Sequence, residues 1–533
     1  MRAFPRRFLQ TLIFIRWPLF AAAVLSLAIV ASGGALRHDA TSAVATGSLA
    51  SYTFGTENSW IRVQNIGAID ANVTVAYYGE NGAKIGEDAC PSPGCAALGP
   101  GQGWTFFQEN NPQLPAGYKG SAVVESDQPI VALQAKDVRR DGRFSVDGDT
   151  TNILAGSSRM FLPLIANHDG AQSDWNGRFA VQNLSDTTTA CVTMTYLSNN
   201  TDGEIAWDPY KPGSKSATKQ NGCPNGGRPI APHATLFRDP DSFGVPSNFT
   251  GSVRIETSKN GQNVAPEQQL LSATADTWNS NSSPFASYRA IDSGDMSNTV
   301  LLPLVDREVG AYNGFSTRFQ IENKDPSRAA QVTIRFEGFD LDHGNAFVAM
   351  QNTMTVGGAR LCFQDRDDYA NCLAPGDALP RNFVGTARLT STQPIGVIVS
   401  RGMRYNDVFT NYRGFRPEDG ANRVLLPVMN KSFGPFNGNR GWDSWFRVLV
   451  ADGGEANVTI RYKGLDLPGG EVSYTVHAFR EFTVFQPNES ILPNGFAGTA
   501  ILESDRPIVA LANLTTDVFS GDPDLLYNGV PLP

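Results

Sequence analysis

The chain has 533 residues, 41% of them hydrophobic, which is enough for several domains with cores of their own. Charged residues make up only 18%, and the 52 glycines and 33 prolines indicate turn-rich β structure and argue against helical bundles. The net charge is −9, and it is −13 without the first 35 residues, which contain four arginines and no acid. Nucleic acids and anionic membrane surfaces are not expected partners, because both favour Lys and Arg.

Residues 1–35 predict an export signal. A basic stretch ends at Arg16, residues 17–30 are apolar, and small residues lead to a cleavage site after Ala35. The alternative is an uncleaved anchor, since residues 12–30 approach the length of a bilayer with only Arg16 as an interruption. The sequence therefore predicts an extracellular or cell-surface protein, in contact with a membrane only through this segment if it is uncleaved.

After this segment, one sequence pattern returns four times. Its anchoring glycines are Gly120, Gly251, Gly385 and Gly498, spaced by 131, 134 and 113 residues. This period is the size of a domain and is too long for a solenoid or propeller repeat. We therefore divide the chain into four units, joined by short linkers into a semi-rigid rod. Their predicted bounds are 48–158 for unit one, 159–297 for unit two, 298–421 for unit three and 422–533 for unit four.

Each unit contains a strand with large apolar residues at every second position, at 73–77, 192–196, 332–336 and 458–462. This alternation is typical of an antiparallel sheet with one buried face. In a second strand, at 496–503, Gly498 is expected on the inner face and Thr499 on the outer face. With turn signals every eight to twelve residues or so, the fold prediction is all-β, with four tandem Ig-like antiparallel β-sandwich domains. A domain the size of unit four is expected to fold alone, with its tail packed on it or docked on a partner chain.

Two further elements recur. Units two to four open with Leu-Pro at residues 162, 302 and 426, and close with a tyrosine-containing joint at Tyr288, Tyr412 and Tyr527. With the Val-Gln-Asn strand and the Phe-x-Gly-Ser-Ala segment, this combination resembles uncharacterised tandem β-sandwich repeats of bacterial secreted and cell-surface proteins. The resemblance covers residues 48–533 and implies architecture and location, but it transfers no catalytic or binding residue.

The six cysteines fall in pairs inside single units, and unit four has none. Such placement predicts local disulfides and an oxidising compartment. The predicted bonds are Cys90–Cys95, Cys191–Cys223 and Cys362–Cys372.

Motifs that carry chemistry are scarce. The sequence shows no phosphate loop, nucleophile elbow, zinc-protease helix or dinucleotide fingerprint, so we expect no catalytic residues, no enzyme activity and no cofactor. Asp340, Asp342 and Asn345 are a candidate Ca²⁺ site, although the matching turn of unit four, 465–470, has only one acid, which favours an ordinary hairpin. Trp442 and Trp445 are a candidate platform for a sugar or a partner protein.

These patterns together predict a non-enzymatic, exported structural or adhesive cell-surface protein. Its expected partners are cell-envelope or other surface proteins, or further copies of itself. The alternative is an array of carbohydrate-binding or ligand-binding modules, for which the partner would be a glycan.

Overall fold

A computed structural model describes residues 43–47, 56–140, 143–151, 156–170, 174–199, 204–208, 223–224, 226–262, 264–280, 285–310, 314–364, 372–403, 408–434, 440–464, 466–518, 522 and 524–533. The described residues form antiparallel β-sheets without an α-helix, which confirms the all-β prediction. None of the helical segments in this part is long and apolar enough to cross a membrane. The predicted export signal at 1–35 lies outside the described residues.

Strands and short turns make up each of the four units. Unit one has β1 (Ala43–Gly47), β2 (Thr56–Asn65), β3 (Val73–Gly79), β4 (Lys84–Cys90), β5 (Gly103–Phe107), β6 (Gly120–Ser126), β7 (Ile130–Arg140) and β8 (Arg143–Thr151). Unit two has β9 (Arg159–Asn167), β10 (Trp175–Asn183), β11 (Ala190–Ser198), β12 (Glu204–Asp208), β13 (Arg228–Ile230), β14 (Thr235–Arg238), β15 (Phe249–Ser258), β16 (Leu271–Asn279), β17 (Phe285–Arg289) and β18 (Ile291–Asp292).

Unit three has β19 (Ser297–Arg307), β20 (Phe315–Asn323), β21 (Ala330–Asp340), β22 (Ala346–Val356), β23 (Ala359–Phe363), β24 (Phe383–Met403) and β25 (Phe409–Arg413). Unit four has β26 (Ala421–Lys431), β27 (Trp442–Val450), β28 (Ala456–Lys463), β29 (Glu471–Ala478), β30 (Glu481–Phe485), β31 (Phe496–Thr516), β32 (Leu525–Asn528) and β33 (Val530–Pro531). Short 3₁₀ turns are η1 (Gln108–Asn110), η2 (Pro240–Phe243), η3 (Pro266–Gln268), η4 (Ser293–Asp295), η5 (Pro417–Asp419), η6 (Pro468–Gly470) and η7 (Gln486–Asn488).

The same strand order occurs four times, in two layers. The first layers are β4-β3-β6-β1, β12-β11-β15-β9, β22-β21-β24-β19 and β29-β28-β31-β26. The second layers are β5-β2-β7-β8, β14-β10-β16-β17, β23-β20-β24-β25 and β30-β27-β31-β32. In units three and four the long strands β24 and β31 run through both layers. Strand β1 takes the place of the Leu-Pro strands by pairing with β6, so the first strand of unit one precedes the predicted boundary at residue 48.

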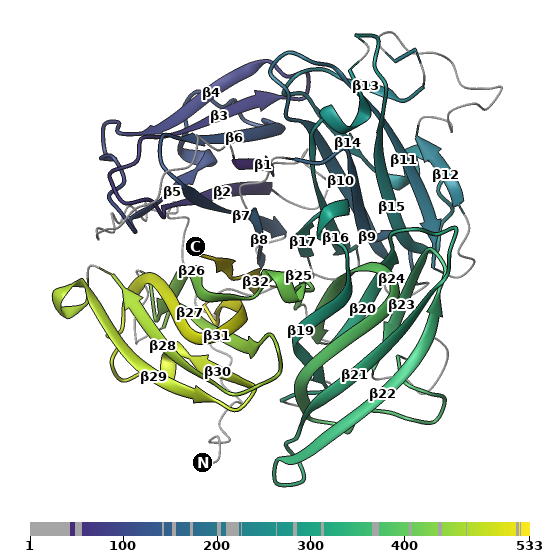
Figure 1. Ribbon diagram of the computed structural model, residues 1–533. Helices are drawn as coiled ribbons and strands as arrows, with labels where there is room; N and C mark the ends of the chain where they lie inside the picture. Colours follow the sequence, from purple (N-terminus) through teal and green to yellow (C-terminus); the bar gives the residue numbers. More distant parts are fainter. Residues whose placement is uncertain are drawn as a thin grey trace.

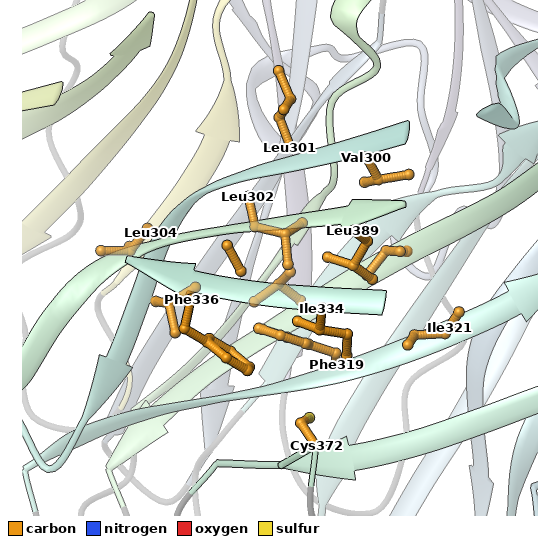
Figure 2. Packing of buried hydrophobic residues seen from close by; sticks show 14 of the residues in the cluster. Val300, Leu301, Leu302, Leu304, Phe319, Ile321, Ile334, Phe336, Cys372 and Leu389 are labelled. Carbon is orange, nitrogen blue, oxygen red and sulfur yellow. The ribbon is translucent and has the colours of Figure 1, made fainter. Parts of the chain in front are cut away.

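The cores lie between the two layers of each unit. In unit three, Ile334 and Phe336 of the first layer meet Phe319 and Ile321 of the second (Figure 2), and all four side chains are fully buried. The predicted alternation is confirmed there, because Arg335, between Ile334 and Phe336, is exposed. It fails in unit two, where the whole of 192–196 is buried, so both faces of β11 are covered.

The two recurring motifs that flank each unit bind each other. Proline has no backbone N–H, and the pairing of the first strand with its neighbour is interrupted at the Leu-Pro of units two to four. A buried tyrosine hydroxyl supplies a hydrogen-bond donor at this interruption. It donates to the carbonyl of the residue after the proline, as from Tyr288 to Leu164 (2.7 Å), from Tyr412 to Leu304 (2.6 Å) and from Tyr527 to Val428 (2.6 Å). The joint of each unit therefore completes the first strand of the same unit.

We expect Tyr412→Phe to lower the free energy of unfolding by about 2 kcal/mol, because it leaves the buried carbonyl of Leu304 without this donor at nearly constant side-chain volume. Thermal and urea unfolding of the full chain measures the change. Tyr474→Phe is the control, since Tyr474 is only half-buried and has no such bond to a Leu-Pro strand. Equal effects of the two changes would contradict this role.

The four units close into a ring, and the predicted rod is wrong. The edge strands of the second layers meet in the middle of the molecule, where β8 contacts β17 and β32, and β25 contacts the same two strands (Figure 1). The carboxylate of Asp522 in unit four accepts the backbone N–H groups of Phe285 in unit two (3.2 Å) and Phe409 in unit three (2.8 Å). Asp522 is fully buried, so this centre joins three units directly.

Between neighbouring units, the first strand of one packs on the second layer of the next. Ile398 of unit three belongs to the core of unit two, and Leu511 of unit four belongs to the core of unit three. The ring closes in the same manner, since Val131 of unit one packs with Leu425 and Val530 of unit four. The C-terminal tail thus packs on its own unit, through the pairing of β33 with β26, and on unit one.

Candidate functional site

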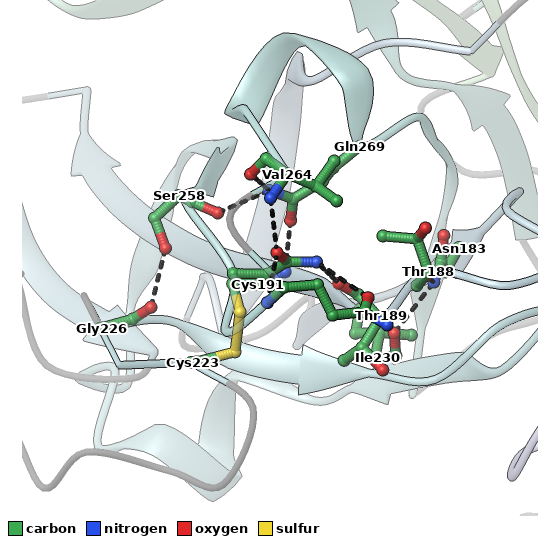
Figure 3. The surroundings of a disulfide bond; sticks show 12 residues. Asn183, Thr188, Thr189, Cys191, Cys223, Gly226, Ile230, Ser258, Val264 and Gln269 are labelled. Atoms are coloured by element: carbon green, nitrogen blue, oxygen red, sulfur yellow. Dashed lines mark hydrogen bonds between the residues drawn. A yellow bond between two sulfur atoms is a disulfide. The ribbon is translucent and has the colours of Figure 1, made fainter.

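The three predicted disulfides are confirmed. Cys90–Cys95, Cys191–Cys223 and Cys362–Cys372 are all bonded, each inside its own unit. Figure 3 shows that the Cys191–Cys223 bond lies beside a buried glutamine, Gln269, whose side chain accepts the backbone N–H of Cys191 (2.8 Å) and donates to the carbonyl of Ser258 (2.8 Å). Three disulfides are consistent with an oxidising, extracellular environment.

The recurring asparagine of the Val-Gln-Asn strand has a structural role. Asn65, Asn183 and Asn323 are fully buried, and each side-chain amide donates to two or more loop carbonyls. Each side-chain oxygen accepts a backbone N–H two residues later. Because all of these bonds are internal, this motif is accounted for by loop geometry.

The candidate calcium turn connects β21 to β22. One carboxylate oxygen of Asp340 accepts the backbone N–H groups of Asp342 (3.0 Å) and His343 (3.2 Å), and the other contacts the His343 ring at 2.7 Å. This hydrogen bond to His343 lowers the pKa of Asp340. The Asp342 side chain accepts from Asn382 (2.9 Å). Among the described residues, no group of three or more His, Cys, Asp or Glu side chains is arranged to hold a metal ion, and calcium binding at this turn stays a prediction.

The structure does not bring Trp442 and Trp445 together. Both are half-buried on β27, but they pack against different hydrophobic clusters, Trp442 on the core of unit four and Trp445 on that of unit three. Trp445 also lies beside Arg401 of unit three, with the guanidinium 5.5 Å from the ring centre. The two rings therefore offer no common platform.

A buried acid that the sequence analysis overlooked lies between units two and three. Glu322, on β20, is fully buried, and burial raises its pKa to about 8, against the opposing effects of Arg254 and Arg159 of unit two. The protonated carboxyl group stabilises the fold when its pKa is higher in the folded state than in the unfolded state. This contribution decreases as the pH rises from the pKa of the unfolded state, near 4.5, to that of the folded state, about 8.

We therefore expect Glu322→Gln to match the wild type at pH 4.5 and to exceed its free energy of unfolding by roughly 4–5 kcal/mol at pH 9. The glutamine needs no proton to enter this site uncharged, whereas the glutamate loses its proton above pH 8. Urea unfolding of both proteins across this pH range measures the difference, in which the titration of all other groups cancels. A difference that does not change with pH would contradict the raised pKa.

An open groove lies where unit three meets unit four. Its volume is about 270 Å³. One wall is the outer face of the first layer of unit three, with Phe339 on β21 and Phe347 on β22, and the other wall includes Phe479 of unit four. Leu301 and Leu449 contribute to its apolar lining. The three phenylalanines are 40%, 57% and 71% exposed, so large apolar side chains are in contact with solvent at the edge of the groove.

Charged residues line the same groove. Glu337 binds two arginines, Arg335 at 2.6 Å and Arg480 at 2.9 Å. Arg388, on β24, lies directly opposite Arg335 in the sheet and has no ion pair with any described residue. Like charges at opposite positions of neighbouring strands repel each other, so this pair of arginines is held at a cost in stability.

The repeat position of Glu337 carries a different residue in each unit, and in unit four it is Lys463. The residue that faces the Ser or Thr after the recurring glycine is Tyr78 in unit one and Leu197 in unit two. Tyr78 stacks on His233 of the next unit at 4.3 Å, and Leu197 is buried. In unit three this residue is Glu337, which forms ion pairs with the two arginines, and the space beside it is open.

No protein-family model matches this chain, and no curated protein matches it.

Proposed function

We propose that this chain is a non-enzymatic, exported structural protein of the cell surface, built from four Ig-like β-sandwich repeats that act as one rigid scaffold. The observation that carries the proposal is the ring itself. The inner edges of all four units and the outer faces of their second layers are used to pack units on one another. A body of this kind presents loops and first-layer faces at its outside in fixed relative positions.

The disulfides support the location. Cys191, Cys223, Cys362 and Cys372 are completely buried in their bonds, as expected for cysteines that stabilise loops. Loops cross-linked in this way are typical of proteins that act in oxidising compartments. The groove between units three and four, with exposed phenylalanines and arginines, supports attachment to a partner at the surface, because these residue types are enriched in protein interfaces.

The proposal is tested in cells of the source organism that carry a C-terminal epitope tag on this chain. We expect the protein in the envelope or medium fraction, labelled on intact cells by a membrane-impermeant amine reagent, with its three disulfides formed in non-reducing peptide maps. A cytoplasmic protein that resists labelling until lysis, with free thiols, would contradict the proposal. A cytoplasmic protein of known location serves as the lysis control.

A further inference from the structure

The groove between units three and four has a chemistry that restricts its occupant. Its apolar part is formed by Leu301, Leu449 and the phenylalanine rings, and Phe339 packs edge-to-face on Phe347 at 6.0 Å between ring centres. A pocket of about 270 Å³ lies below the usual size range of about 300–1,000 Å³ for small-molecule sites. It has room for a large side chain or two, which would bury themselves among these residues.

The charges favour an anion beside that side chain. Three arginines, Arg335, Arg388 and Arg480, line the groove against two acids, Glu337 and Glu481. Glu481 is bound to a fourth arginine, Arg447, at 2.6 Å, and Glu337 is shared by two of the three. The side chain of Arg388 is exposed and lies next to the apolar lining of the groove. A carboxylate placed there would accept a charge-assisted hydrogen bond from its guanidinium.

The exposed rim indicates a macromolecule. Phe347 and Phe479 remain more than half exposed, and Leu341, in the turn after β21, is 39% exposed. A small molecule inside the groove would leave most of this apolar surface in water, whereas a polypeptide laid across it would cover the rim as well. Clustered aromatic and arginine side chains around a pocket are the usual anchors of protein interfaces.

We infer that this groove binds an acidic segment of a partner protein, which inserts one large apolar side chain among the phenylalanines and places a neighbouring carboxylate on Arg388. This inference rests on the proposed function, since it names the partner chemistry of the scaffold. It differs from the glycan alternative, because a neutral sugar has no carboxylate for Arg388.

The test uses fluorescein-labelled peptides of the form Gly-Asp-X-Glu-Gly, in which X is Phe, Leu or Trp, and matched peptides in which lysines replace both acids. Binding to the full mature chain is followed by fluorescence anisotropy, with 3-phenylpropionate as a competitor that represents a small-molecule site. The variants are Arg388→Gln and Phe479→Ala, and Ile69→Ala is the matched control, because Ile69 is 62% exposed on unit one. None of these side chains is buried, so the variants are expected to fold.

We expect at least one acidic peptide to bind saturably below about 1 mM and its lysine counterpart to bind at least about tenfold more weakly. Arg388→Gln and Phe479→Ala should each weaken binding by about fivefold or more, and Ile69→Ala should leave it unchanged. The inference is overturned by no saturable binding of any acidic peptide, by equal binding of the lysine peptides, or by phenylpropionate binding as tightly as the peptides. If one of these results is obtained and the protein is nevertheless exported, the inference about the groove is wrong but the proposed function is not contradicted.

Discussion

Unit four alone, expressed as residues 422–533, is expected to be unfolded or aggregated, although its length is that of an independent domain. In the ring it buries apolar side chains against units one and three, and separation exposes them to water. These residues are Leu425, Leu449, Val509, Leu511, Leu526 and Val530. Burying such a side chain contributes about 1.5–3 kcal/mol, so the total loss is on the order of 10 kcal/mol, as large as the whole stability of a typical domain.

Circular dichroism and size-exclusion chromatography measure this outcome, with the full chain from residue 36 as the control, which should unfold in one cooperative transition. The control also shows whether the units depend on one another, because independent units would unfold in separate steps. A monomeric 422–533 with a cooperative thermal transition would contradict the account and restore the sequence-based expectation of a self-sufficient unit.

Replacing the recurring glycine of unit four, in Gly498→Ala, is expected to lower the free energy of unfolding by about 4 kcal/mol. A Cβ atom at this position would lie 2.1 Å from the backbone oxygen of Lys463 on β28 and 2.6 Å from the ring of Phe496. The ring can turn aside, but the oxygen belongs to a paired strand, so β28 and β31 must separate. Overpacking usually costs about 1–3 kcal/mol, and a clash with backbone adds to this.

The same contact occurs at Gly120, Gly251 and Gly385, where the nearest backbone oxygen would be 1.9, 2.0 and 2.3 Å away. Gly294→Ala is the matched control, because its Cβ would meet only the Asp292 side chain, at 3.7 Å. Urea unfolding of the full chain compares the two variants. A loss at Gly498 no larger than that at Gly294 would show that the close approach does not exist. Thr499, expected on the outer face, is only 1% exposed and is unsuitable as a control.

Local features were predictable where a single physical cause determines them. The alternation in 332–336 located β21, and the pairwise placement of the cysteines located all three disulfides. The prediction that the recurring glycine faces inward was also correct, but the reason for it was wrong. The space at Gly498 is taken by Phe496 of the same strand and by a carbonyl of the neighbouring strand, and not by a residue of the facing layer.

The ring was missed although the sequence contains a signal for it. Residues 508–512 read Ile-Val-Ala-Leu-Ala, and residues 395–399 read Ile-Gly-Val-Ile-Val. Such continuous apolar runs are typical of strands that are buried on both faces, which a single two-layer unit in a rod cannot provide. Val509 and Leu511 pack on the neighbouring unit, whereas Ile508 and Ala510 pack inside their own.

The groove could not be predicted from one strand, because its walls come from different units. Glu337 lies at the position of Tyr78 and Leu197, a difference visible by aligning the units, but its effect depends on Arg480, more than a hundred residues away. Likewise, the position of Arg388 opposite Arg335, without an ion pair to any described residue, becomes apparent only when β21 and β24 are paired. Pairing across the ring, and not local propensity, creates this site.

Small-angle X-ray scattering of residues 36–533 tests the closed ring most directly. A compact body of this length has a radius of gyration of about 23 Å, whereas four units in a rod would give roughly twice that value. The ring predicts the smaller radius and a single compact peak in the distance distribution. A radius near 45 Å, with a long tail of distances, would contradict the closure of unit four on unit one.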